Sequence, residues 1–449
     1  MFGHSPRRVP RVSFRAAEGC EVVSGAGPGT RRDRGDGTNV ALNALRFGAA
    51  LVVVVSHVRP LLYVDFSQAL DAGPGPRAIY AVTTLGHQAV IVFFVLSGYW
   101  VGGSVLRGLR ERRFDVARYA TSRAVRLWIV LLPAMVLTQA LDRSGTWFFP
   151  DSDVYAGSTA YHLVVPQDGA LHRLGALTTL GNAVFLQSLA VPQLGTDTPL
   201  WSLALEFWYY VIFPAVLLAV WRGVARRVRL VAALVGAVGL AVLWYGHTQG
   251  SQGLVLFPTW LVGAGVAWAL EPVGRALGRV PAWALGPVRA ATVVAVVGVA
   301  LVHHALGEGF ALSLVLALVA GLLVALLTTD VRGVVRRFWN PFSWGAEWSY
   351  SLYATHVPVI AFVTAILAPV AAGRRQLTWA TLPVGLGVAA VAVLVALAVY
   401  AVAERHTGAL RAVLLRAVPR PRLFAPVPAD AGTRVANHPP RAGFHPLDH

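Results

Sequence analysis

The sequence contains no lysine, a single cysteine and few charged residues. Charged side chains make up 13% of the 449 residues and apolar side chains 56%. A soluble domain has about 25% charged and roughly 45–50% apolar residues. This balance excludes a water-soluble enzyme. Cys20 lies in a polar stretch without a second cysteine, so the sequence offers no disulfide and no thiolate cluster. We expect neither a metal nor redox chemistry.

Because lysine is absent, arginine supplies all 38 basic residues, which exceed the 21 acidic ones and give a net charge of +17. Nucleic-acid binding would need these arginines clustered on a soluble surface. They lie instead between apolar runs of about 20 residues, the length of a helix that crosses a bilayer. We therefore expect the lipid bilayer as a partner, and no nucleic acid.

The sequence predicts an all-α integral membrane protein, a bundle of about ten transmembrane helices with disordered cytosolic tails at both ends. This number comes from the apolar helical runs, which are long enough to span. The runs cover residues 39–58, 79–103, 124–141, 200–221, 228–245, 254–270, 290–306, 310–328, 349–370 and 380–403.

The segment 176–191 is an eleventh apolar piece, shorter than a span and interrupted by Asn182 and Gln187. If it does not cross and the N-terminus is cytosolic, the arginine-rich loops all lie inside. If it crosses, three of those loops lie outside, against the positive-inside rule. We therefore expect a multi-pass plasma-membrane protein with both termini in the cytosol. The segment then becomes a re-entrant or interfacial piece of an outer connection, 142–199.

Three regions follow from this assignment. Residues 1–38 read as a disordered, arginine-rich cytosolic tail, and residues 39–405 as the ten-helix membrane domain. Residues 406–449 read as a second cytosolic tail, rich in proline and arginine and disordered from about residue 418, because it has too little apolar surface to fold.

Arg46 and His57 are ionisable residues within the first span, where a charge costs at least about 2.5–3.5 kcal/mol. Eleven residues of helix amount to three turns plus roughly 20°, and to a rise of about 16 Å. The two side chains therefore share one face, Arg46 in the inner half and His57 near the outer boundary. Alternatively, Arg46 snorkels to the interface and His57 is an interfacial histidine.

Glu206 lies about two turns into the fourth span, close to the depth inferred for His57. A carboxylate at that depth would fix the tautomer of the imidazole and strengthen it as a base. Alternatively, Glu206 is the structural partner of an arginine in another helix.

His356, in the ninth span, and Glu404, at the end of the tenth, are expected at the inner level of Arg46. Arg123 and Arg126 lie three residues apart on one helix face at the same level. Paired guanidinium groups suit phosphates, although an arginine pair of this kind also satisfies the positive-inside rule without any ligand.

Ser97 and Gly98 form a small-residue pair in the second span. Such a pair is typical of close helix packing. No GxSxG elbow surrounds Ser97, which disfavours it as a nucleophile.

Five segments, taken in order, resemble the acyltransferase family 3 of membrane proteins over about residues 39–405. Each one is weak alone, but their order across ten spans is specific. They are the pair Arg46-x10-His57, AVIVFFVLSGYW at 89–100, Arg123-x-x-Arg126 followed by Pro133, PLWSLALEFWYY at 199–210, and SYSLYATHVP at 349–358.

The resemblance implies transfer of an acyl group, with acetyl expected, from acyl-CoA to a hydroxyl of a glycan, a glycolipid or a glycosylated small molecule. Arg46, Arg123 and Arg126 would hold the CoA phosphates, and His356 would belong to the same acyl-CoA site. His57 would act as general base or carry the acyl group, and Glu206 would orient it.

Two features depart from the family pattern. Ile91 stands where relatives often have an acidic residue, so any role of that acid is absent or filled elsewhere. Many relatives also end in a soluble hydrolase-like domain, whereas here we expect only the tail, so transfer would be completed within the membrane domain.

Two other classes of protein remain open at this point. A transporter or flippase of a glycolipid-like substrate also needs intramembrane charges, but the sequence has no visible repeat. A non-catalytic scaffold or receptor would tolerate alanine at Arg46, His57 and Glu206.

Overall fold

The computed structural model of the chain describes residues 32–70, 73–161, 164–277, 280–307, 309–328 and 334–418. In these residues helices carry the fold, and the only β contacts are two isolated bridges, Tyr63 with Arg375 and Gln187 with Val191. Ten of the described helical segments are long and apolar enough to cross a membrane. They confirm the predicted all-α membrane bundle.

The ten spans are formed by long helices, two of which are continued by a further helical segment. Helix α3 continues through a π-helical turn, Gly98–Gly102, into α4. The helices are α1 (Arg32–Leu62), α3 (Gly86–Ser97) with α4 (Gly103–Arg110), α5 (Val116–Phe148), α8 (Leu200–Val220), α9 (Arg226–Thr248), α10 (Gly253–Leu277), α11 (Ala282–Leu306), α12 (Phe310–Leu327), α13 (Val334–Leu367) and α14 (Leu382–Val402).

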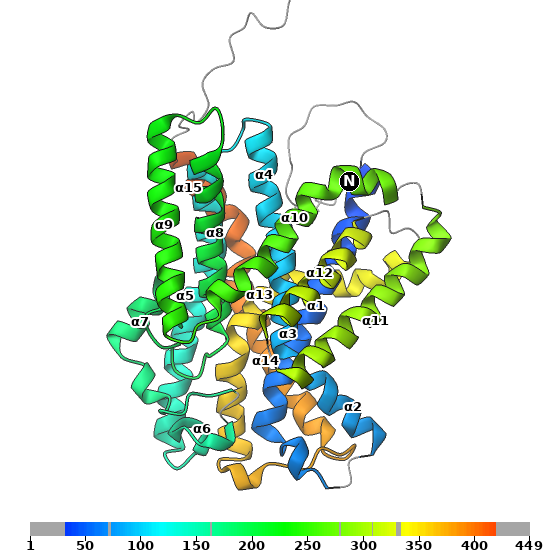
Figure 1. Cartoon of the computed structure of the whole chain (residues 1–449). Helices are drawn as coiled ribbons and strands as arrows, with labels where there is room; N and C mark the ends of the chain where they lie inside the picture. Colours follow the sequence, from blue (N-terminus) through cyan, green and yellow to red (C-terminus); the bar gives the residue numbers. More distant parts are fainter. Residues whose placement is uncertain are drawn as a thin grey trace, which may run out of the picture.

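Helix α1 lies in the middle of the bundle, where it packs along α13 and α3 (Figure 1). Its start lies at the same end of the bundle as α4, and its finish lies near the short helix α2 (Pro74–Thr83). We call these two ends of the bundle the Arg46 side and the His57 side. Helix α9 lies at the periphery and leaves apolar side chains such as Leu230 and Leu234 exposed, as a lipid-facing helix does.

Helices α3 and α10 approach each other backbone to backbone. A Cβ atom added to Gly98 would overlap the carbonyl oxygen of Trp260, and one added to Gly263 would overlap that of Val95. The Ser97-Gly98 pair therefore marks close helix packing, as predicted.

The connection between α5 and α8 is compact and carries the short helices α6 (Asp153–Ala156) and α7 (Ala176–Ala183). Eight residues of α7 rise about 12 Å, too little to cross a bilayer, so the segment 176–191 is not a span. Asp142, at the end of α5, accepts hydrogen bonds from the backbone N (2.7 Å) and the hydroxyl (2.8 Å) of Thr196. These bonds tie the connection to the bundle.

Helical structure is present at both ends of the membrane domain. Helix α1 begins at Arg32, within the region assigned to the N-terminal tail. Helix α15 (Thr407–Ala417) lies in the part of the C-terminal region that precedes residue 418, from which disorder is expected. Residues 1–31 and 419–449 lie outside the described residues.

Candidate active site

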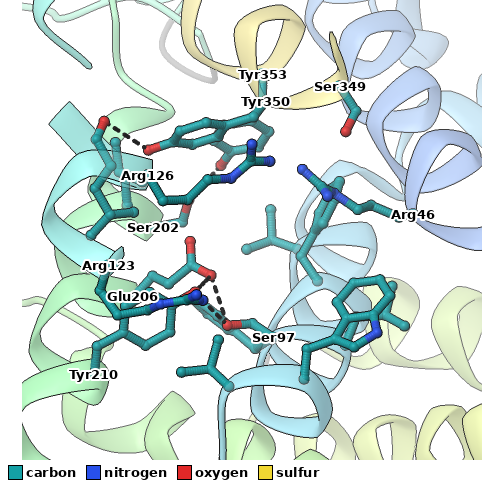
Figure 2. A pocket seen from close by; sticks show the side chains of 18 residues that line it. Arg46, Ser97, Arg123, Arg126, Ser202, Glu206, Tyr210, Ser349, Tyr350 and Tyr353 are labelled. Carbon is teal, nitrogen blue, oxygen red and sulfur yellow. Dashed lines mark hydrogen bonds between the residues drawn. The ribbon is translucent and has the colours of Figure 1, made fainter. Parts of the chain in front are cut away.

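A polar pocket of about 170 Å³, which we call the arginine pocket, lies inside the bundle between α1, α3, α5, α8 and α13. Figure 2 shows Arg46 and Arg126 pointing toward each other across it. The polar residues that line it are Arg46, Ser97, Arg123, Arg126, Ser202, Glu206, Tyr210, Ser349, Tyr350 and Tyr353, and the others are Val90, Phe93, Phe94, Leu96, Trp100, Val101, Leu127 and Leu203.

The three arginines of this pocket differ in their partners. Arg126 forms an ion pair with Glu404, with 3.1 Å between Nη1 and Oε1, and its guanidinium lies over the ring of Tyr350. Within the described part of the chain, neither Arg46 nor Arg123 makes an ion pair with a carboxylate or donates a side-chain hydrogen bond. Two guanidinium groups are therefore left for an anionic ligand.

Glu404 holds its place through α13 as well as through Arg126. Its Oε2 accepts hydrogen bonds from the backbone N (3.0 Å) and the hydroxyl (2.6 Å) of Ser351. The prediction that Glu404 lies at the level of Arg46 and Arg126 is therefore correct, and its role there is to hold Arg126.

Glu206 is held by hydroxyl groups on the wall of the arginine pocket. Its Oε1 accepts hydrogen bonds from Ser97 (2.7 Å) and from Tyr210. The Ser97 hydroxyl in turn accepts one from the indole N–H of Trp260 at 3.1 Å. Ser97 is thus a support for Glu206, and the carboxylate contributes negative charge to a pocket lined by three arginines.

The expected pair of Glu206 with His57 does not form, and neither does an ion pair of Glu206 with an arginine within the described residues. Pro199 and Trp201 line the same pocket as His57, so α8 begins at the depth of that histidine. Glu206 lies five residues beyond Trp201, about 7.5 Å deeper along the helix. The sequence estimate failed because it treated Glu206, about two turns into the fourth span, as level with His57, which lies near the end of the first span.

A second pocket of about 500 Å³, the histidine pocket, lies on the His57 side. The α5–α8 connection contributes much of its lining, so that connection covers the pocket as well as joining helices. The lining residues are Val53, Ser56, His57, Arg59, Pro60, Thr83, Thr84, Gly86, His87, Val90, Val164, Val165, Pro166, Gln167, Arg173, Gln193, Thr198, Pro199, Trp201, His304 and Tyr353.

His57 contacts a second histidine, His356 of α13. Nδ1 of His57 lies 2.8 Å from the carbonyl oxygen of Val53 and 3.2 Å from Nε2 of His356. Nδ1 of His356 lies 2.8 Å from the carbonyl oxygen of Tyr353 and 3.1 Å from that of Leu352. Each imidazole therefore has one nitrogen directed at backbone carbonyl groups.

These contacts define the tautomers of both rings. A carbonyl oxygen only accepts hydrogen bonds, so Nδ1 of each histidine carries the proton. The neutral His356 then offers an Nε2 lone pair to the Nδ1 proton of His57. Nε2 of His57 keeps its own lone pair for a ligand in the histidine pocket, which is the arrangement that a general base requires.

The expected position of His356, beside Arg46 at the inner level, is wrong. The helix that carries it, α13, begins at Val334 and not near residue 349, so His356 lies about 33 Å along the helix from its start, where about 10 Å was expected. The sequence estimate placed the start of the span too late, because the polar stretch before Trp348 is helical and precedes the apolar run.

Sequence reasoning overlooked His87 and His303. The His87 ring stacks on Trp201 at the histidine pocket, with 5.8 Å between ring centroids, and on His303. His303 is fully buried between Gln88 and Ser313, with 2.9 Å to each. Both histidines fall inside predicted spans, so the rule that singled out His57 would have found them.

The arginine and histidine pockets meet at Val90 and Tyr353, the two residues that line both of them. The side chains brought together on the arginine side are Arg46, Arg123, Arg126 and Glu206. Those brought together on the other side are His57 and His356. The pocket that holds the three arginines therefore adjoins the pocket that holds His57.

Ten spanning helices, with one pocket between them and a second pocket where they meet the α5–α8 connection, define a multi-pass membrane protein with an internal site. Residues 39–401 match the family model described as an acyltransferase domain. The chain belongs to this acyltransferase family, and the protein is a membrane acyltransferase. This result confirms the predicted enzyme class over a transporter or a scaffold.

One curated relative is acyltransferase MdmB of Streptomyces mycarofaciens. It is 27% identical to this chain over 416 residues, which cover 87% of this chain and 95% of the relative. No solved structure matches the chain.

Proposed function

We propose that this acyltransferase moves a short acyl group, with acetyl expected, from acyl-CoA to a hydroxyl of a glycan, a glycolipid or a glycosylated small molecule. The observation that carries the proposal is the meeting of two pockets at Val90 and Tyr353. One pocket has unpaired arginines for a phosphorylated donor, and the other has the free Nε2 of His57 for an acceptor hydroxyl.

The donor enters from the Arg46 side. Arg46 and Arg123 bind CoA phosphate groups through paired guanidinium N–H donors. Arg126, which already contacts Glu404, adds positive charge. The pantetheine arm then runs through the arginine pocket, with the thioester toward Val90 and Tyr353. Glu206 is a positioning residue whose negative charge offsets part of the arginine charge.

The acceptor enters the histidine pocket. His57 Nε2 takes the proton of the acceptor hydroxyl, whose oxygen attacks the thioester carbonyl carbon. The carbon–sulfur bond breaks, the acyl group stays on the acceptor oxygen, and the proton passes from His57 to the CoA thiolate. His356 holds the ring and tautomer of His57 and is not part of the acyl-CoA site.

The proposed orientation follows from arginine distribution. The loops on the Arg46 side carry most of the arginines, including those at 107–118 and 222–229, while the His57 side carries few. By the positive-inside rule, the Arg46 side is cytosolic, where acyl-CoA is made. Both termini are then cytosolic, the membrane is the plasma membrane, and acceptors reach the histidine pocket from outside.

A comparison of cell-surface glycans, glycolipids and secreted glycosides by mass spectrometry tests this function. Four strains are compared, carrying the intact gene, a deletion, His57→Ala or His247→Ala. His247 is exposed and lines neither pocket, so it is the matched control. We expect one acyl mass to be lost in the deletion and in His57→Ala, and kept in His247→Ala. An acyl mass that persists in His57→Ala would remove that histidine from the mechanism.

A further inference from the structure

Tyr353 and Val90 form the partition between the two pockets. Both side chains are at least nine-tenths buried, with exposed fractions of 8% and 5%, and both line the arginine pocket and the histidine pocket. Figure 2 shows Tyr353 at one end of the arginine pocket. Any acyl group that passes from the donor to an acceptor beside His57 has to pass these two side chains.

The tyrosine is anchored from both sides of this partition. Its hydroxyl shares a hydrogen bond of 2.6 Å with the hydroxyl of Ser202, which lines the arginine pocket. It also donates to the carbonyl oxygen of Pro199, at 3.1 Å, and Pro199 lines the histidine pocket. The ring of Phe93 packs edge-on against the ring of Tyr353. The position of Tyr353 is therefore determined by the side chains of Ser202 and Phe93 and by the carbonyl group of Pro199.

Val90 is the second residue that lines both pockets, and it has little freedom to move. It lies on α3, which packs against α1 and α10 through close contacts. A β-branched side chain on a helix has one strongly preferred rotamer, so valine presents a fixed surface here. The space beside Tyr353 consequently depends on the size of the residue at position 90.

We propose that Val90 and Tyr353 determine the length of acyl chain that the enzyme accepts. The inference rests on the proposed function. It adds that the two residues between the pockets limit the length of the acyl chain. A short acyl group places its carbonyl at the partition. Each further methylene must fit between Val90 and the anchored ring, and an apolar pocket discriminates one methylene by about 10-fold to 200-fold.

The test measures CoA release by purified protein in detergent from acetyl-, butyryl-, hexanoyl- and octanoyl-CoA. The acceptor is an extract of the lipids, glycans and small glycosides of the source cells. We expect Val90→Ala to raise the butyryl-to-acetyl rate ratio by about 10-fold or more, and Val90→Leu to lower it. Tyr353→Phe removes both hydroxyl anchors but keeps the ring, so it should raise the ratio as well and provides an independent variant if Val90→Ala does not fold.

Val95→Ala is the matched control, because Val95 is a buried valine on the same helix that lines neither pocket. It should keep the wild-type ratio. Ratios that stay unchanged in the Val90 and Tyr353 variants, or that shift equally in Val95→Ala, overturn the inference and leave the proposed function standing. A wild-type protein that releases no CoA from any of the four donors overturns the proposed function itself.

Discussion

Nε2 of His356 lies 3.2 Å from Nδ1 of His57, with the two rings in a T-shaped arrangement. The partner of the candidate base is therefore a second imidazole from α13 and not a carboxylate. A neutral partner fixes the tautomer of His57 without placing a negative charge inside the bundle, where an unpaired charge is expensive.

Replacing His356 with phenylalanine should slow acyl transfer without weakening the binding of acyl-CoA. The substitution removes one of the two acceptors of the Nδ1 proton and leaves the carbonyl oxygen of Val53 as the other. The His57 ring is then held less firmly, and a misplacement of about 1 Å can reduce a rate by about 100-fold. We expect kcat to fall by about 10-fold to 100-fold with little change in KM for acyl-CoA, measured by CoA release. A raised KM for acyl-CoA with an unchanged kcat would instead indicate that His356 contributes to acyl-CoA binding.

Substitution of Arg46 by lysine should have the opposite kinetic effect. Lysine keeps the positive charge but loses the planar fork that binds two phosphate oxygens. A lost charge-assisted hydrogen bond is worth about 1.5–3 kcal/mol, so KM for acyl-CoA should rise by about 10-fold or more. Arg222→Lys, at an exposed position outside both pockets, is the control. Equal KM values in the two variants would argue against phosphate contact at Arg46.

Glu206→Gln should leave the pH profile of kcat unchanged, because Glu206 contacts Ser97 and Tyr210 and not the histidine pair. Loss of its negative charge from the arginine pocket should instead change KM for acyl-CoA. Rates over pH 5–9 test this expectation, with Ser97→Ala as a companion that disturbs the same carboxylate. A profile displaced in Glu206→Gln but not in Ser97→Ala would show coupling of Glu206 to His57.

Asp197, in the connection before α8, should make the protein less stable as the pH rises. Burial raises the pKa of Asp197 well above its usual value, one hydrogen bond from Thr138 opposes this shift, and nearby Asp142 adds to it. The folded state therefore binds the Asp197 proton more tightly than the unfolded state does. Asp197 makes its full contribution to the free energy of unfolding below about pH 4, the pKa of an aspartate in the unfolded chain. This contribution falls as the pH rises toward the pKa of Asp197 in the folded state.

Asp197→Asn removes this titration and should raise the melting temperature at pH 7 relative to the wild type. Thermal unfolding in detergent at pH 5 and pH 8 measures the effect, and Asp151→Asn, at an exposed position, should behave as wild type. The wild type and Asp197→Asn should differ in how their melting temperatures change from pH 5 to pH 8. An equal change in the two proteins would contradict the raised pKa of Asp197.

The sequence alone determined the number of spans and the set of polar residues inside them. Both properties are local, because a run of apolar residues long enough to cross a bilayer is helical wherever it packs, and an ionisable residue within such a run is visible without a fold. The order of the five motifs was likewise readable along the chain. Arg46, Arg123 and Arg126 were correctly placed on one side because arginine marks the cytosolic side of a membrane helix.

Only the tertiary structure decided which polar residues meet. Pairing depends on the relative depth of helices far apart in the sequence, and that depth is set by packing and by connections. The α5–α8 connection lines the histidine pocket, and α8 begins at the depth of His57. Glu206 therefore lies deeper in the bundle than His57 and does not contact it. The polar start of α13 is helical, which brings His356 to His57. The partition formed by Val90 and Tyr353 joins two helices in space, and no spacing along the chain indicates it.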